Sequence, residues 1–162
     1  MELWDAYDKN MNRVGGELLR GKPIPEGLFH LVCEALILHR DGSILVMKRH
    51  DEKESNPGLY EASAGGSAMQ GEDPLSCIER EVFEETGVVP EELICYGVSS
   101  SQNTHYVQYV AQCACEKDSI LLQEGETTAY QWVTRNQLQG MIDEGLLPLR
   151  HSKNVSYLLK VI

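Results

Sequence analysis

The chain has 162 residues, 42% of them hydrophobic, which is enough for one globular domain with its own core. Its 25 acidic and 14 basic side chains give a net charge of −11, and this excludes a nucleic-acid polymer as partner because such binding depends on Lys and Arg. No stretch approaches the roughly 20 apolar residues of a membrane span, and the first residues lack the features of a secretory signal. We therefore expect a soluble, cytoplasmic protein with no membrane partner and a small-molecule ligand.

The first predicted elements form an N-terminal extension over residues 1–25. Within it, Leu3–Tyr7 is β-prone, and a polar turn connects it to a second segment over 13–20 before a Gly- and Pro-containing break. Two apolar, β-prone runs follow, Leu31–His39 and Ile44–Lys48, and the Arg-Asp-Gly-Ser sequence between them indicates a hairpin. Trp4 in the extension could stack on a nucleobase, or it could have a core or flap role instead.

A charged loop over 51–57 separates these strands from the central part of the chain, where a helix is predicted over Pro74–Thr86. Its apolar stripe would consist of Leu75, Ile78 and Val82. Downstream, the pattern predicts strands over 93–99, 106–115 and 130–133, a helix over 136–144 capped by Thr134, and a short helix over 152–159. Mixed strands and helices of this kind predict an α/β or α+β fold.

The central helix carries the most informative pattern in the chain. Asp73 suits the N-cap, Pro74 suits the first helical position, and Gly87 suits the C-terminal stop. On this helix Glu84 and Glu85 follow Glu81 by three and four residues, so the three carboxylates share one face. Their like charges repel unless a cation lies among them. Converging oxygen ligands suit Mg²⁺ or Mn²⁺, although a solvated acidic helix face is the alternative.

The spacing from Gly66 to Val88 resembles the Nudix box of the Nudix hydrolases. Gly66 is followed after five residues by Glu72 and after seven more by Arg80-Glu81, with Glu84-Glu85 and Gly87 in register. The resemblance covers about residues 28–145, and it implies a single domain (1–162) with an α/β/α sandwich around a mixed sheet. It also implies a Mg²⁺-dependent hydrolase, with Mn²⁺ as a possible substitute. The reaction would be attack of water on a phosphoanhydride bond of a nucleoside diphosphate linked to another group.

The resemblance further implies roles for particular residues of the box. Glu81, Glu84 and Glu85 match metal-ligand positions, and the backbone carbonyl of Gly65 matches a further one. Arg80 matches a residue that holds a catalytic glutamate by a charge-assisted hydrogen bond, although binding of a substrate phosphate is the alternative.

Two carboxylates outside the helix complete the candidate site. Glu72 matches a position near the metal cluster, but it could also act only on the helix dipole. Glu126, six residues before Trp132, is a candidate general base, with Glu124 as its competitor and a solvated hairpin carboxylate as the alternative.

The opening segment and the PGLYEASAGGS run also resemble the Nudix branch related to isopentenyl diphosphate isomerase. The isomerases carry a catalytic cysteine and a metal-binding histidine where this chain has Ala64 and Gly66, so isomerisation is a weaker alternative to hydrolysis. A non-catalytic nucleotide-binding module is a third reading, although such domains typically lose the carboxylates. Tyr106 lies where dinucleoside-polyphosphate hydrolases often carry tyrosine, which is weak evidence, and the substrate stays undefined. The family also makes a homodimer possible.

The remaining reactive side chains carry weaker signals. The five histidines are dispersed without ligand spacing, so structural or surface roles are expected. The five cysteines form no paired C-x-x-C motifs, and a domain of this size needs no disulfides, so we expect reduced thiols. Cys113 and Cys115 would share one face of a strand, which leaves a soft-metal or redox role as the alternative.

Overall fold

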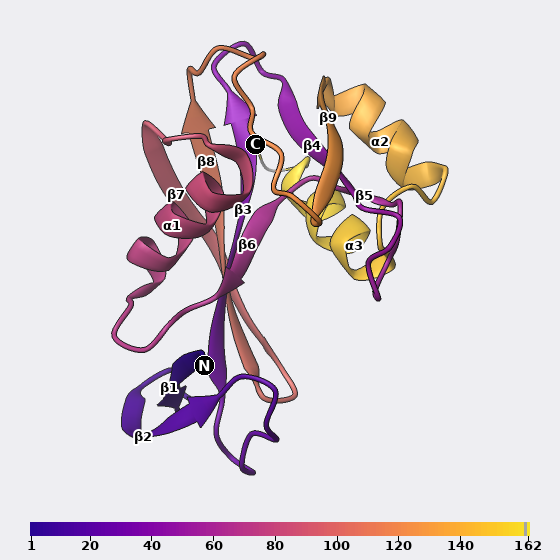
Figure 1. The fold of residues 1–162 in the computed structure, drawn as a ribbon. Coiled ribbons are helices and arrows are strands. Elements are labelled where there is room, and N and C mark those ends of the chain that lie inside the picture. The colour runs from indigo at the N-terminus through magenta and orange to yellow at the C-terminus, as the bar shows by residue number, and fades with distance from the viewer. Residues whose placement is uncertain (161) are drawn as a thin grey trace.

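The structure is a computed structural model, and it describes residues 1–160 and 162. Its elements are arranged as a small N-terminal hairpin below a large sheet with helices on both faces (Figure 1). The strands are β1 (Leu3–Tyr7), β2 (Arg13–Leu19), β3 (His30–His39), β4 (Ile44–Arg49), β5 (Tyr60–Glu61), β6 (Ala64–Ser67), β7 (Glu92–Ser101), β8 (Thr104–Cys113) and β9 (Thr127–Val133). The helices are α1 (Pro74–Thr86), α2 (Arg135–Asp143) and α3 (Leu149–Leu158).

The large sheet is mixed, with strand order β5-β4-β3-β8-β7. β3 and β8 run parallel from the pair His30–Thr104 to the pair His39–Cys113, and the other pairings are antiparallel. β6 adds to β3 and β9 adds to β4, so the sheet opens between β3 and β4 beyond the pair Leu38–Ile44. This opening places β6 beside the middle of the sheet, where it leads directly into the loop before α1.

Two hydrophobic cores cover the two faces of the sheet. Along β3, Leu31, Cys33 and Ile37 belong to the core that includes Ile78 and Val82 of α1. Leu36, in contrast, belongs to the second core, which is shared with α2 and α3. This alternation follows from the two-residue side-chain period of a strand. The predicted α/β/α sandwich around a mixed sheet is therefore confirmed.

The N-terminal extension forms a β hairpin, in which the predicted strand Leu3–Tyr7 pairs with Arg13–Leu19, and it has a small core of its own, made by Trp4, Ala6 and Leu18. It joins the large sheet through Tyr7 and Phe29, whose backbones exchange two hydrogen bonds of 2.9 Å each. Trp4 is buried and its ring stacks on His30 at a centroid distance of 4.4 Å. Of the two roles considered for Trp4, the structure favours the core.

Several predicted boundaries are shifted by tertiary pairing. The strand expected over 106–115 is displaced to Thr104–Cys113 because its ends match those of its parallel partner β3. β9 begins at Thr127 instead of residue 130 because it pairs with β4 up to Arg49. The short β5 and β6 were not predicted as strands, since the Gly65-Gly66 pair of β6 lacks β-prone side chains. The C-terminal helix begins at Leu149, earlier than expected.

One prediction about the core of α1 was wrong. Leu75 is 48% exposed, whereas Cys77, Ile78, Val82 and Thr86 are buried. The buried stripe thus extends toward the C-terminal end of the helix through Thr86, whose hydroxyl donates to the Val82 carbonyl at 2.6 Å. A polar residue could take this core position because its hydrogen-bonding group is satisfied within the helix.

None of the helices in the described residues is both long enough and apolar enough to cross a membrane.

Candidate active site in the pocket between β6 and α1

The caps predicted for α1 fix the helix at both ends. The Asp73 carboxylate accepts hydrogen bonds from the backbone N–H and the hydroxyl of Ser76, at 2.7 and 2.8 Å. Gly87 has φ of 73°, a left-handed conformation that glycine adopts readily, and its N–H donates to the Phe83 carbonyl. These caps define the two ends of α1, which follows β6 after the loop 68–73.

A polar pocket of about 380 Å³ lies between β6 and α1 and contains the predicted catalytic and metal-binding residues. The predicted residues in its lining are Gly65, Arg80, Glu81, Glu84, Glu85 and Glu126. The structure also adds residues that the sequence did not single out, namely Glu2, Arg20, Lys53, Ser67, Met69 and Gln123. Only Lys53, within the predicted charged loop, had any sequence signal. The pocket therefore combines the box with segments far away in the chain.

Arg80 is at the centre of the carboxylates. Its Nε and Nη2 donate to the two oxygens of Glu72 at 2.7 and 2.9 Å. Its Nη1 donates to Glu81 at 2.7 Å and to Glu84 at 3.2 Å, and Nη2 also reaches the Ser67 carbonyl at 3.2 Å. The hydrogen bonds that Arg80 donates to Glu72 raise the pKa of Arg80 and lower the pKa of Glu72. A bidentate pair to Glu72 thus orients the guanidinium, which holds Glu81 in place.

Glu85 occupies the deepest position in the site. Its carboxylate accepts a hydrogen bond from the backbone N–H of Gly65 at 3.1 Å. Burial, with a further contribution from the nearby Glu81, raises the pKa of Glu85 to about 8. Burial also raises the pKa of Glu81, although Arg80 opposes this effect. The raised pKa values of Glu85 and Glu81 mean that their ionised forms are destabilised here, so the site favours added positive charge.

The two glycines of β6 allow close approach of the strand to its neighbours. A Cβ at Gly66 would lie 2.5–2.8 Å from the carboxylate of Glu81. A Cβ at Gly65 would lie 2.2 Å from the Cys33 carbonyl oxygen and 2.8 Å from the Glu34 Cα. Gly65 is therefore required by packing against β3, and Gly66 leaves space for the side chain of Glu81.

The oxygen-rich donor set fits a hard divalent cation. Glu81, Glu84 and Glu85 line one pocket together with Gly65. However, within residues 1–160 and 162, no three His, Cys, Asp or Glu side chains are close enough to form a ready metal cage. In this arrangement Arg80 donates to Glu81 and Glu84, and Glu85 accepts from the Gly65 N–H.

Glu126 reaches the same pocket from the segment before β9. Its carboxylate forms an ion pair with Lys53 and is 46% exposed. Glu126 lines this pocket beside the box, whereas Glu124 does not, and the role of Glu126 as a base stays a prediction.

A second polar region adjoins the site at Gly65 and Glu85, on the side of α3. Its lining includes Glu34, Glu61 and His151, and a pocket of about 170 Å³ extends it toward Arg150. The Arg150 guanidinium lies 3.8 Å from the centroid of the Tyr106 ring and 3.3 Å from Glu34.

His151 is half-buried at this place, and its Nε2 accepts the Ala62 N–H at 2.8 Å. Burial lowers the pKa of His151 to about 4. These residues are separated by up to 117 positions, so no local pattern could reveal them.

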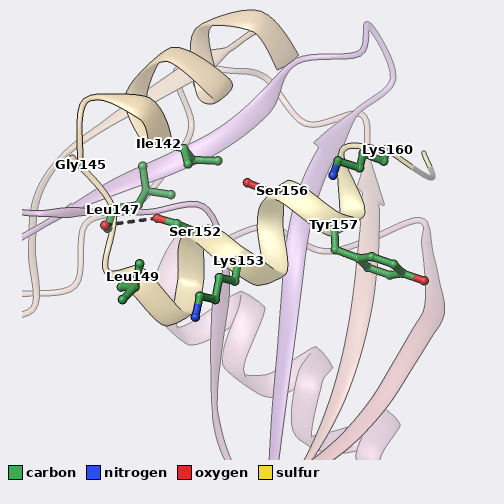
Figure 2. A pocket seen from close by; sticks show the side chains of 9 residues that line it. All are labelled: Ile142, Gly145, Leu147, Leu149, Ser152, Lys153, Ser156, Tyr157 and Lys160. Atoms are coloured by element: carbon green, nitrogen blue, oxygen red, sulfur yellow. Dashed lines mark hydrogen bonds between the residues drawn. The ribbon is translucent and has the colours of Figure 1, made fainter.

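A larger groove of about 610 Å³ lies between α2 and α3, away from the box (Figure 2). Its lining presents Leu149, Tyr157 and two lysines, Lys153 and Lys160, in place of carboxylates. The hydroxyl of Ser152 donates to the Leu147 carbonyl at 3.3 Å, which connects α3 to the segment before it. Without a cluster of acidic groups, this groove does not offer the donor set that a hard metal requires.

The remaining reactive residues have structural positions. All five cysteines are free thiols, as expected, and the Sγ atoms of Cys113 and Cys115 are 3.9 Å apart. His105 is buried between the Asp8 carbonyl at 2.7 Å and the Ser100 hydroxyl at 2.6 Å, where it connects the hairpin turn to the sheet.

Comparison with known proteins identifies the family. The NUDIX domain model matches residues 29–154, which is most of the chain. The chain belongs to the Nudix family. This match begins within one residue of the predicted start at residue 28 and extends beyond the predicted end at 145.

Named relatives agree with this assignment. An uncharacterized Nudix hydrolase of Listeria monocytogenes is 29% identical over 90% of this chain and 87% of its own length. The uncharacterized Nudix hydrolase YfcD of Salmonella typhi is 30% identical over 87% of this chain and 77% of its own. The predicted enzyme class, a Nudix hydrolase, is therefore confirmed, whereas the isomerase-like branch is not specified by these relatives.

Solved structures confirm the fold of this Nudix protein. The protein DR0079 from Deinococcus radiodurans superposes with a TM-score of 0.75 at 19% identity, covering 96% of this chain and 98% of the other. The NUDIX domain of Shewanella oneidensis NrtR, in complex with ADP ribose, gives a TM-score of 0.62 at 16% identity, covering 79% and 84% of the two chains. At these identities the similarity concerns the fold alone.

Proposed function

We propose that this Nudix protein is a Mg²⁺-dependent hydrolase that cleaves a phosphoanhydride bond of a nucleoside diphosphate linked to another group. The observation that carries the proposal is the gathering of Glu81, Glu84 and Glu85 with Gly65 in one polar pocket. Mn²⁺ is a substitute of the same hard character. The expected cytoplasmic location and a homodimer stay predictions.

The residues of the pocket have separate roles in this proposal. Glu81, Glu84, Glu85 and the Gly65 carbonyl would hold the cation, which when bound would neutralise phosphate charge and lower the pKa of a bound water. Arg80, itself oriented by Glu72, positions the Glu81 carboxylate. A carboxylate at the edge of the cluster, Glu84 or Glu126, accepts the proton of the attacking water; both are about half exposed and line the pocket.

The alternative functions lack supporting observations in the structure. Ala64 is 1% exposed and packed in the core, so its position offers neither a thiol nor space for one near the pocket. The carboxylates that a non-catalytic module would lose are retained and are organised around Arg80. Hydrolysis therefore accounts for more of the arrangement than isomerisation or simple binding does.

A substrate panel with a matched pair of variants tests the proposal. The panel contains ADP-ribose, a dinucleoside polyphosphate, other nucleoside diphosphate derivatives and isopentenyl diphosphate, each incubated with Mg²⁺ and followed by chromatography. Glu84→Gln/Glu85→Gln should lower kcat/KM by about a thousandfold or more, because two oxygen ligands lose their charge. Glu79→Gln/Glu116→Gln, which neutralises two exposed carboxylates outside the pocket, should retain wild-type activity.

Two results would contradict the hydrolase proposal. One is a wild-type protein that cleaves no member of the panel; the other is a Glu84→Gln/Glu85→Gln variant as active as the wild type. Conversion of isopentenyl diphosphate to its isomer without cleavage would support the isomerase alternative instead.

A further inference from the structure

The pocket between β6 and α1 contains more basic side chains than the box supplies. Arg80 is engaged by Glu72, Glu81 and Glu84, so its donors already have partners. Among the described residues that line the pocket, the other basic side chains are Arg20 and Lys53. Both come from segments outside the box, and neither was predicted to belong to the site.

Arg20 reaches the pocket because the N-terminal hairpin is docked on the loop before α1. The backbone N–H of Gln70 donates to the Leu3 carbonyl at 2.8 Å, and the N–H of Gly71 donates to the Asp5 carboxylate at 2.8 Å. Arg13 donates to the Glu72 carbonyl at 2.9 Å. These contacts attach β1 and β2 directly to the loop that carries Glu72, and they fix the end of β2 beside the box.

The guanidinium of Arg20 is held but still accessible. Its Nη1 donates to Glu2 at 2.8 Å, and its side chain is 68% exposed. Glu2 also accepts a hydrogen bond from the Trp4 indole at 2.7 Å. If Arg20 turned toward a ligand, Glu2 would therefore keep a partner, which lowers the cost of exchanging the Glu2 carboxylate for another anion.

Lys53 has a similar arrangement on the loop that follows β4. Its ammonium group forms an ion pair with Glu126, and the lysine side chain is 25% exposed while the carboxylate is 46% exposed. Each cation is thus paired with one carboxylate of the pocket wall, and each lies outside the Arg80 network.

The pocket lining is so acidic that an anionic ligand would need basic side chains such as Arg20 and Lys53 nearby. The lining carries Glu2, Glu81, Glu84, Glu85 and Glu126, so a diphosphate would meet strong repulsion without local cations. A divalent ion over the box would neutralise only one part of the ligand. Guanidinium and ammonium groups beside it suit the other phosphate oxygens, since Arg binds phosphate through a planar fork and Lys as a point charge.

We propose that Arg20 and Lys53 bind the diphosphate of the substrate, and that the N-terminal hairpin is therefore part of the active site. The proposal rests on the proposed function for the identity of the ligand. The domain match covers residues 29–154, so it includes Lys53 but not Arg20. The hairpin adds to the family domain a basic group that becomes available when phosphate replaces Glu2.

The test measures binding and turnover separately. Binding of methylenebisphosphonate, a non-hydrolysable diphosphate analogue, is measured by calorimetry at constant free Mg²⁺, and KM and kcat are measured on the best panel substrate. Arg20→Gln should weaken analogue binding and raise KM about tenfold, with kcat changed less than threefold. Lys53→Met should weaken analogue binding and raise KM by a similar factor. Arg40→Gln, which removes an exposed arginine paired with Glu91, is the matched control and should behave as wild type.

A second variant distinguishes ligand binding from a structural role of the Glu2–Arg20 pair. If Arg20 binds phosphate, Glu2→Gln releases it from its competitor and should lower KM two- to fivefold. If Arg20 only holds the hairpin in place, Glu2→Gln should resemble Arg20→Gln and both should lower the melting temperature. That second pattern would overturn the proposal.

The outcomes separate this inference from the proposed function. If the wild type cleaves panel substrates while Arg20→Gln and Lys53→Met keep wild-type KM and analogue affinity, the two-cation proposal is wrong and the hydrolase proposal stands. If no substrate is cleaved but the analogue binds in an Arg20-dependent manner, the diphosphate site stands without hydrolysis. Failure of the wild type to bind the analogue overturns the inference.

Discussion

The two faces of the large sheet differ in how their carboxylates are balanced. On the α1 face, Arg80 is shared by Glu72, Glu81 and Glu84, and Glu85 accepts only a backbone N–H in the described residues. On the side of α3, each carboxylate has a cation of its own: Glu34 is paired with Arg150 and Glu61 with Arg49 at 2.7 Å.

This difference shows where added positive charge would be stabilised. On the α1 face one guanidinium serves more carboxylates than it can neutralise. Burial raises the pKa values of Glu81 and Glu85 there and of Glu61 on the α3 side, so the contrast between the two sides lies in the pairing of their charges. On the α3 side the ion pairs are matched one to one, and the neighbouring His151 has a pKa lowered to about 4, so it is neutral near pH 7. A divalent cation is therefore expected on the α1 face and not beneath α3.

Gly65 lies between the two faces, and substituting it should have the largest effect. A Cβ in Gly65→Ala would overlap the backbone of Cys33 and Glu34, so we expect a loss of at least about 3 kcal/mol in unfolding free energy. Denaturant titration measures this loss. Gly15→Ala in β2, where a Cβ meets no atom within 4 Å, is the matched control. A small loss would mean that β6 can move away from β3 without disturbing either face.

Arg80→Lys should have the next largest effect, and it tests the shared cation of the α1 face. Lysine cannot form the bidentate contact with Glu72 and still reach Glu81, so Glu81 loses its orientation. We expect kcat/KM to fall by about a hundredfold, as for other residues that orient metal ligands. Steady-state kinetics on the best panel substrate measures this change. Arg40→Lys, at an exposed position, should have no effect. Full activity of the Arg80→Lys variant would contradict the role assigned to the Arg80 guanidinium.

The smallest predicted effect concerns pH and the α3 side. His151 titrates near 6.5 when unfolded and near 4 when folded, so the unfolded state binds more protons between these values and stability falls as the pH is lowered from 6.5. At pH 5 the loss should be about 2 kcal/mol relative to pH 7.

In His151→Gln, this part of the pH dependence should disappear, because glutamine can still accept the Ala62 N–H but does not become charged. Urea denaturation at pH 5 and pH 7 measures the difference. Parallel stability curves for the two proteins would contradict the assignment to His151, since nearby Glu34, Glu61 and Arg150 remain in both.

Much of the site was predictable because the box is contiguous. Asp73, Pro74 and Gly87 determine the ends of α1 through local hydrogen bonds and backbone geometry, and the helix period places the glutamates on one side. Leu75 was wrongly placed in the core, because helical period alone does not show that Thr86 can be buried with its hydroxyl bonded to Val82.

The sequence alone therefore determined the family, the helix of the box and the order of its charged residues, since these depend on interactions within about 25 positions. Tertiary structure decided which other groups share the pocket. Arg20 and Lys53, which no pattern predicted, join the predicted Glu126 in this pocket because the hairpin docks on the loop before α1 and β9 pairs with β4. Such pairings depend on hydrogen bonds and packing between distant segments, which no local pattern encodes.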